Sequence, residues 1–228
     1  IVPDWIPGER ILEIEWGADT ARFRPDVPPS ADVRRRPEET LAVFAGAFRT
    51  WHGAIHLVDA IGRLRQRGFD TIGAVFAGNG PERARVEAAA RGLSGVRFLG
   101  PVPHDRMPSV LTACDIGVAP FDVAVHRPLS LGFYWSPLKV FEYMAAGLPV
   151  VAPAIPRLAT IVTDGREGLL YDPERPGALA DALVALSDAA RRRRLGAAGR
   201  ARVADAFSWA SHCAALDTAI RTLARQRR

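Results

Sequence analysis

Short apolar runs alternate with segments of helical spacing along most of this chain. Apolar runs of the length of buried strands lie at residues 41–45, 72–77, 96–99, 116–119, 149–152 and 168–171. Segments with helical spacing or composition lie at residues 55–64, 82–91, 105–113, 137–146, 157–162, 177–187, 190–205 and 208–225. Strands that are apolar throughout and separated by helices indicate a mostly parallel sheet that is covered on both faces. The pattern therefore predicts an α/β, Rossmann-like open sheet of about six strands.

The composition divides the chain into four segments. Residues 1–25 are expected to be an entry segment that leads into the domain, and residues 26–40 a proline-rich linker or loop. Residues 41–206 would form the Rossmann-like domain, and residues 207–228 a C-terminal helix. Because the chain starts at Ile1 and not at a methionine, we expect a fragment of a longer protein.

Composition and charge narrow the classes of function. The chain of 228 residues is 48% hydrophobic and 24% charged, with a net charge of +5. It contains no signal peptide and no apolar run near the roughly 20 residues that span a bilayer. The arginine runs at residues 34–36 and 191–194 lack the interleaved aromatic residues of a nucleic-acid surface. We therefore expect a cytoplasmic protein that binds no nucleic acid, with peripheral contact to the anionic inner face of a membrane as an alternative use of the charge.

Metal ligands are not evident in the sequence. The two cysteines, Cys114 and Cys213, lie far apart and have no histidine at metal-ligand spacing. No cluster of acidic residues resembles a magnesium site. The sequence therefore predicts a reducing compartment and no bound metal.

The single lysine of the chain, Lys139, marks a candidate anion site. The chain holds 30 lysine and arginine residues, and Lys139 is the only lysine among them. Ser136 suits the N-cap of a helix of roughly three turns, and Pro137 suits its first position. A helix start and an ammonium group together favour a phosphate, and Glu142, one turn further on, can accept hydrogen bonds from ribose hydroxyls. The alternative is a capped surface helix in which Lys139 and Glu142 pair with each other.

Several motifs follow one another in a recognisable order. They are residues 17–25 (GADTARFRP), 77–81 (AGNGP), 96–100 (VRFLG), 142–151 (EYMAAGLPVV), 164–170 (DGREGLL) and 207–209 (FSW). In this order they resemble the C-terminal, donor-binding half of retaining GT-B glycosyltransferases, of the family 4 or group 1 type. The resemblance covers nearly the whole chain, and it implies that the entry segment, residues 1–25, contains the hinge between two domains. It implies a nucleotide-diphospho-sugar as donor substrate, no further cofactor, and an acceptor-binding N-terminal domain as partner.

The resemblance also implies roles for individual residues. Glu142 would hold the ribose hydroxyls, while Lys139, Ser136 and the backbone N–H of Leu138 would meet the diphosphate. The backbone near Val102 would meet the edge of the base. The 77–81 turn adds Gly78 to the expected donor-binding residues, because the loops after the strands that end at residues 45, 77, 99 and 119 should line the site.

The loop at residues 46–53 (GAFRTWHG) departs from the family pattern. The family has an arginine where this chain has Ala47 and a lysine where it has His52. Arg49, two residues after Ala47, would then reach the phosphates in place of the family's arginine. A protonated His52 would supply part of the charge of the family's lysine. The alternative is that Arg49 is a solvated loop residue and His52 a packed turn residue.

A second departure concerns the transferred sugar. The family often has a glutamate eight positions before the one at 142, and Tyr134 stands there in this chain. Asp122 and His126, in the long loop at residues 120–135, are then the candidates for contacts to the sugar hydroxyls. The alternative is that this aromatic loop only folds over the edge of the core.

The expected function is that of a donor-binding domain in a metal-independent glycosyltransferase that retains the anomeric configuration. Lys139, Arg49 and His52 are the predicted catalytic residues, because fixed cations stabilise the negative charge on a leaving diphosphate. The fragment alone is expected to be inactive, since the cleft of this fold closes between two domains. The alternatives are a non-catalytic nucleotide-sugar-binding scaffold and a GT-B sugar-nucleotide epimerase.

Overall fold

A six-stranded parallel sheet forms the centre of the protein. The computed structural model describes residues 7, 11–12, 14–125 and 136–226. The strands are β1 (Thr40–Ala45), β2 (Ile72–Ala77), β3 (Val96–Gly100), β4 (Ile116–Val118), β5 (Val150–Pro153) and β6 (Gly168–Tyr171). They are ordered β3-β2-β1-β4-β5-β6, and every neighbouring pair is parallel. The predicted α/β, Rossmann-like sheet is confirmed.

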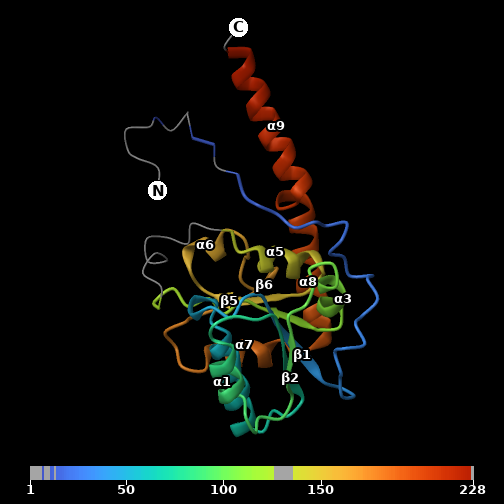
Figure 1. Ribbon diagram of the computed structural model, residues 1–228, viewed down its shortest axis with the longest axis vertical. Coiled ribbons are helices and arrows are strands. Elements are labelled where there is room, and N and C mark those ends of the chain that lie inside the picture. Colours follow the sequence, from blue (N-terminus) through green and yellow to red (C-terminus); the bar gives the residue numbers. More distant parts are fainter. Residues whose placement is uncertain (1–6, 8–10, 13, 126–135, 227–228) are drawn as a thin grey trace.

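Helices cover both faces of this sheet (Figure 1). They are α1 (Ala54–Gln66), α2 (Arg83–Ala89), α3 (Met107–Thr112), α5 (Leu138–Ala145), α6 (Pro156–Ala159), α7 (Ala178–Ala185), α8 (Ala189–Ala206) and α9 (Trp209–Gln226), with a turn of 3-10 helix, η2, at Thr50–His52. The side chains of α1, α2 and α7 pack in one apolar core, and those of α3, α5 and α6 in another. Adjacent residues of one strand alternate between these cores, as Val43 and Phe44 do.

The segment before the sheet is packed against the domain. Val33 is buried in the core, and the Ser30 N–H donates to the carbonyl of Ser109 over 2.8 Å. The Glu39 side chain is buried between Arg36 and Arg97, with 2.7 Å from Arg97 Nη2 to Glu39 Oε2. Its arginine neighbours outweigh the effect of burial and lower the pKa of the Glu39 carboxyl. The proline-rich segment is therefore fixed where it enters β1.

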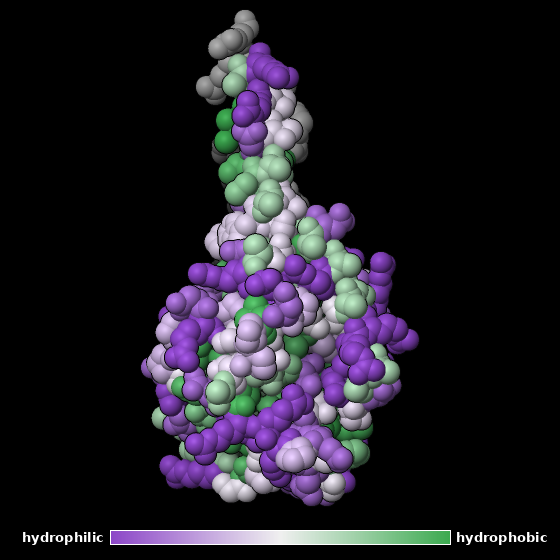
Figure 2. Space-filling model, turned by 90° about the vertical axis from the view of Figure 1, so that its right-hand side faces the viewer, coloured by the Kyte–Doolittle hydropathy of each residue, from purple (hydrophilic) through white to green (hydrophobic). Residues whose placement is uncertain are grey.

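Helix α9 projects away from the body of the domain, where Figure 1 draws it in red. One side of it carries exposed apolar residues at heptad-like spacing, Trp209, Leu216, Ile220 and Leu223. Figure 2 shows hydrophobic side chains along this projecting part. None of the helices in the described part of the chain combines the length and the apolarity of a membrane span.

The start of α5 differs from the sequence expectation. The N-cap is Pro137, with φ −80° and ψ 64°, and no side chain caps the helix. The helix is eight residues long, which is about two turns instead of three. Ser136 therefore does not cap α5; its hydroxyl oxygen is buried without a hydrogen-bond partner among the described residues. The prolyl ring at 137 sets the backbone that enters the helix, and this moves the boundary by one residue.

Candidate functional site

The candidate site lies at the carboxyl ends of β1 and β4. The strand order places β2 and β3 on one side of β1, and β4, β5 and β6 on the other. Connections that leave adjacent strands in opposite directions open a crevice at this point, where ligands of such sheets bind. The site expected from the sequence therefore lies at the topological switch point of the sheet.

Tyr143 of α5 is inserted between the ends of these two strands. Its hydroxyl accepts a hydrogen bond from the Ala45 N–H over 2.8 Å and donates to the Val118 carbonyl over 3.4 Å. The residue at 117 must be glycine, because a Cβ there would lie 2.4 Å from the Tyr143 ring. Sequence analysis noted Tyr143 only as part of a motif. Its role depends on contacts with residues far away in the chain, which no local pattern reveals.

Lys139 lies beneath this crevice as a buried cation. The side chain is 9% exposed, and among the described residues Nζ has no hydrogen-bond partner. Nζ lies 4.3 Å from the ring centroid of Phe44 and 5.1 Å from that of Phe121. Burial lowers the pKa of Lys139 to about 7, and the charge of Glu142 offsets this only in part. Within the described part of the chain, Lys139 Nζ thus faces aromatic rings and no hydrogen-bonding anion, which makes it a candidate for binding an anionic ligand.

Glycines shape the wall in front of Lys139. At Gly46, with φ of 137°, a Cβ would lie 3.2 Å from Lys139 Nζ. At Gly78, with φ of 135°, a Cβ would lie 2.0 Å from the carbonyl oxygen of Gly46. The backbones of the loops after β1 and β2 thus contact each other directly. Because glycine has no side chain, a ligand can approach the backbone closely here. The predicted site residue Gly78 lies here because no other residue permits this approach.

His52 is uncharged in the free protein at neutral pH. Burial lowers the pKa of His52 to about 4, and the nearby charges of Lys139 and Arg49 act in the same direction. Its Nδ1 lies 2.6 Å from the Ala47 carbonyl oxygen and must carry the proton, because a carbonyl only accepts. The protonated His52 expected beside the phosphates is therefore not the form of the free protein, and its protonation next to a bound phosphate stays a prediction. Arg49 is exposed, and its guanidinium lies 5.5 Å from the ring centroid of Trp51.

Glu142 pairs with a histidine and not with Lys139. Its Oε1 lies 2.9 Å from Nε2 of His104, and the side chain is 18% exposed. Burial raises the pKa of the Glu142 carboxyl, while the hydrogen bond from His104 and the charge of Lys139 oppose the rise. The alternative of a simple Lys139–Glu142 surface pair is therefore not observed. His104 was not singled out in the sequence; its position five residues after the apolar run of β3 was the only signal.

The remaining expected donor contacts lie around this centre. The Leu138 N–H donates to the Ser136 carbonyl over 3.0 Å, so a ligand would have to replace that bond. Val102 is partly buried and lines a hollow of about 150 Å³ after β3, together with Leu99 and Pro101. Ser136 precedes α5, Lys139 lies in its first turn beside Gly46 of the loop after β1, and Glu142 lies three residues further on.

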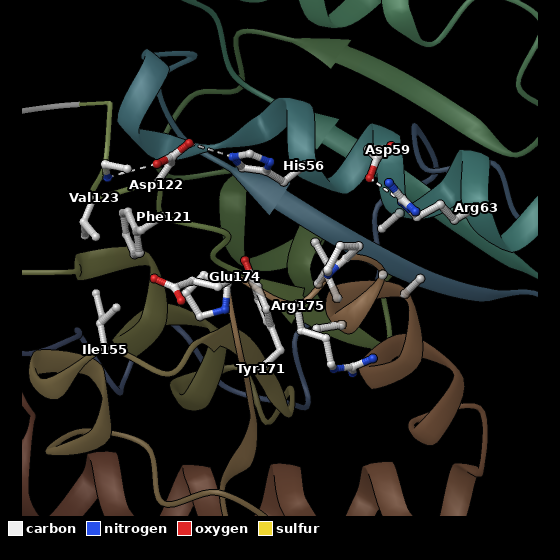
Figure 3. Close-up of a pocket in the computed structure, with 18 residues that line it drawn as sticks. His56, Asp59, Arg63, Phe121, Asp122, Val123, Ile155, Tyr171, Glu174 and Arg175 are labelled. Carbon is white, nitrogen blue, oxygen red and sulfur yellow. Dashed lines mark hydrogen bonds and ion pairs between the residues drawn. The ribbon is translucent and has the colours of Figure 1, made fainter.

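A larger hollow of about 400 Å³ adjoins the site, between α1, the loop after β4, and the segment from β6 to α7 (Figure 3). Phe121, which contacts Lys139, forms part of its wall. Asp122 lies at the rim, where Oδ2 is 3.0 Å from Nε2 of His56. Asp122 thus remains a candidate for sugar contacts, while His126 and Tyr134 lie outside the described residues. In the described part of the chain, no group of three or more histidine, cysteine, aspartate or glutamate side chains could hold a metal ion.

Comparison with known proteins decides the family. Residues 39–189 match the profile described as "Glycosyl transferases group 1". The chain belongs to this family. A curated relative is D-inositol 3-phosphate glycosyltransferase from Nocardia farcinica, which is 32% identical over 214 residues, covering 89% of this chain and 45% of the relative. This group 1 chain thus spans about half the length of the curated relatives it matches.

Solved structures agree with the fold of the group 1 domain. Sucrose-phosphate synthase from Thermosynechococcus elongatus superposes with a TM-score of 0.73 at 27% identity, over 93% of this chain and 52% of that one. HepE from Anabaena, solved with UDP and glucose, superposes with a TM-score of 0.69 at 19% identity, over 91% of this chain and 55% of that one. The Rossmann-like sheet described above is therefore that of GT-B glycosyltransferases.

Proposed function

We propose that this chain is the donor-binding domain of a retaining, metal-independent GT-B glycosyltransferase of the family 4 type. It would bind a nucleotide-diphospho-sugar, and the complete protein would transfer the sugar to an acceptor. The observation that carries the proposal is Lys139, a buried ammonium at the switch point with no hydrogen-bond partner among the described residues. A group that is costly to bury in this way indicates a ligand of opposite charge.

The proposed donor contacts start from Lys139. The diphosphate would lie against Lys139, Ser136 and the start of α5, with Gly46 and Gly78 allowing its close approach. In this pose the Ser136 hydroxyl, which has no hydrogen-bond partner among the described residues, gains an acceptor. Glu142 would accept from the ribose, and the base would lie near Val102. HepE, which shares the fold, was solved with UDP and glucose, and this supports a nucleotide-sugar as the donor class.

Catalysis in this proposal is stabilisation of the leaving diphosphate. As the bond from the anomeric carbon to the phosphate oxygen breaks, negative charge collects on the diphosphate and positive charge on the sugar. Lys139 is already held in place by Phe44 and Phe121, so it meets that charge without reorganisation. Arg49 would approach from the loop after β1. His52, neutral in the free protein, would take up a proton only when the anion raises its pKa.

A second domain is proposed to complete the cleft. The chain covers about half the length of its relatives, and the side chains of the apolar stripe on α9, Trp209, Leu216, Ile220 and Leu223, are exposed. Exposed apolar surface of this kind marks a site of contact with another surface. We propose that an acceptor-binding N-terminal domain covers this stripe, and that this chain alone transfers no sugar. Cytoplasmic location and peripheral contact with an anionic membrane stay predictions.

One observation favours a non-catalytic alternative. Ala47 and the uncharged His52 leave the site with fewer fixed cations than the family pattern supplies. A protein of this kind would bind the donor without transferring or hydrolysing its sugar. Joining the chain to its N-terminal half and measuring release of the nucleoside diphosphate separates an enzyme from a binding protein.

The donor-binding role can be tested on the chain as it is. UDP, GDP, ADP and their sugar conjugates are added in turn, and thermal unfolding is recorded. A ligand at a hundred times its Kd adds about 2.7 kcal/mol to the free energy of unfolding, so one of the series is expected to raise the melting temperature by several degrees. A flat response to every nucleotide would contradict the proposal.

A further inference from the structure

A hydrogen-bonded chain of three side chains ends at the carboxylate proposed to bind ribose. His104 Nε2 lies 2.9 Å from Glu142 Oε1, and His104 Nδ1 lies 3.3 Å from Arg22 Nη1. A carboxylate only accepts and a guanidinium only donates, so Nε2 carries the proton and Nδ1 accepts from Arg22. Both neighbours therefore require the same neutral tautomer of His104, which leaves its N–H directed at Glu142.

The imidazole of His104 is held in this position although it is 61% exposed. Its ring centroid lies 5.3 Å from that of Phe23, which is fully buried. The carbonyl of Phe23 accepts from Arg200 of α8 over 2.8 Å. The backbone of His104 follows Pro103 and closes a turn into α3, with Met107 N–H donating to the His104 carbonyl over 3.3 Å. A side chain braced in this way can fix the orientation of its partner.

We propose that His104 is a positioning residue that orients the Glu142 carboxylate and thereby sets the preference of the site for ribose over 2′-deoxyribose. The inference rests on the proposed function, because it assumes that Glu142 faces a nucleotide. The Nε2–H of His104 donates to Oε1 of Glu142, so that Oε2 would accept from the ribose hydroxyl. Burial favours the protonated carboxyl, and the His104 hydrogen bond opposes this. Without it the carboxyl would be a weaker acceptor and free to turn.

The experiment compares a ribonucleotide with its 2′-deoxy form. Isothermal calorimetry gives Kd for whichever of UDP, GDP and ADP binds, and for its 2′-deoxy counterpart. The wild type is expected to prefer ribose by roughly tenfold, the size of one hydrogen bond to a charged group. His104→Ala should reduce this ratio several-fold, and His104→Gln should restore much of it, because its amide N–H can donate from nearly the place of Nε2. Glu142→Gln should reduce the ratio at least as much.

A second histidine–carboxylate pair supplies the control. His56 Nε2 lies 3.0 Å from Asp122 Oδ2 at the neighbouring hollow of about 400 Å³, and His56 is 45% exposed. His56→Ala is expected to leave the ratio unchanged. An unchanged ratio in His104→Ala, or in Glu142→Gln, overturns the positioning role while nucleotide binding stands. Failure of the wild type to bind any of the three nucleotides overturns the proposed function itself. The two failures are therefore distinguishable.

Discussion

The hydroxyl of Tyr143 accepts a hydrogen bond from the backbone N–H of Ala45 over 2.8 Å, and so joins α5 to the last residue of β1. Strand β1 pairs with β4 at Ala42 and Val43, so the bond from Ala45 to Tyr143 lies beyond the paired residues of the two strands. At this point the Tyr143 side chain, and not a backbone group of β4, accepts the hydrogen bond from the Ala45 N–H. The same helix carries Lys139 and Glu142, and the position of both therefore depends on Tyr143.

Removing that hydroxyl should destabilise the domain. Tyr143→Phe leaves the buried Ala45 N–H without its acceptor, which costs about 1–3 kcal/mol in free energy of unfolding. Denaturation in urea measures the loss as a lower midpoint at unchanged slope. Tyr171→Phe is the control, because it removes the same atom from a side chain whose hydroxyl makes no hydrogen bond with the described residues. A smaller loss in free energy of unfolding is expected for this variant. Equal losses in the two variants would show that the bond to Ala45 contributes little.

Replacing Lys139 should stabilise the free protein and abolish nucleotide binding. Lys139→Met keeps the contacts with Phe44 and Phe121 and removes a buried charge that has no hydrogen-bond partner among the described residues. A gain of about 1 kcal/mol or more in free energy of unfolding is expected at pH 7. The expected loss of diphosphate binding is measured by calorimetry. A less stable variant that still binds would remove Lys139 from the proposed site.

The stability difference between wild type and Lys139→Met should depend on pH. The pKa of Lys139 is about 7 in the folded protein and 10.5 as its ordinary value. Between these values the unfolded chain binds the proton and the folded one does not, so wild-type stability rises with pH over that range. The advantage of the methionine variant should be largest at pH 7 and below, and should shrink toward pH 10. Thermal unfolding from pH 6 to pH 10 gives the two curves, and parallel curves would contradict the assignment.

Binding of a nucleoside diphosphate above pH 7 should take up a proton. The free Lys139 amine is largely neutral there, and an adjoining diphosphate favours its charged form. The affinity should accordingly fall as the pH rises from 7 to 9. Calorimetry at pH 8.5, in two buffers with different ionisation enthalpies, counts the protons taken up. Where residual binding to Lys139→Met is measurable, this variant serves as the negative control. Uptake of less than half a proton per bound nucleotide in the wild type would contradict the coupling between binding and protonation of Lys139.

Restoring the arginine of the family pattern should strengthen binding. Ala47 is exposed at the mouth of the site, so an arginine can be accommodated there. Ala47→Arg is expected to tighten diphosphate binding roughly three- to tenfold, since an added cation near the phosphates contributes about 1 kcal/mol. Ala88→Arg, at an exposed position of α2, changes the net charge by the same amount. If both variants bind equally tightly, the gain reflects net charge and not the place of Ala47.

Much of the fold could be predicted from the chain, because each strand leaves a local signal. The runs at 72–77 and 168–171 match β2 and β6, and the motif around Glu142 located the helix of the site. The start of α5 was misplaced by one residue, because Pro137 fits either an N-cap or a first helical position. Sequence reasoning could not find His104, since its partner lies 38 residues away.

The sequence by itself determined the order of strands and helices, the single lysine and the family motifs, because apolar spacing and turn residues are local properties. Tertiary structure alone decided the burial, the protonation and the pairing of the ionisable groups. The burial of Lys139 between Phe44 and Phe121, the neutral His52, and the pairing of Glu142 with His104 all arise from residues distant in the chain. Burial and neighbouring charges set a pKa, and both are known only when the chain is folded.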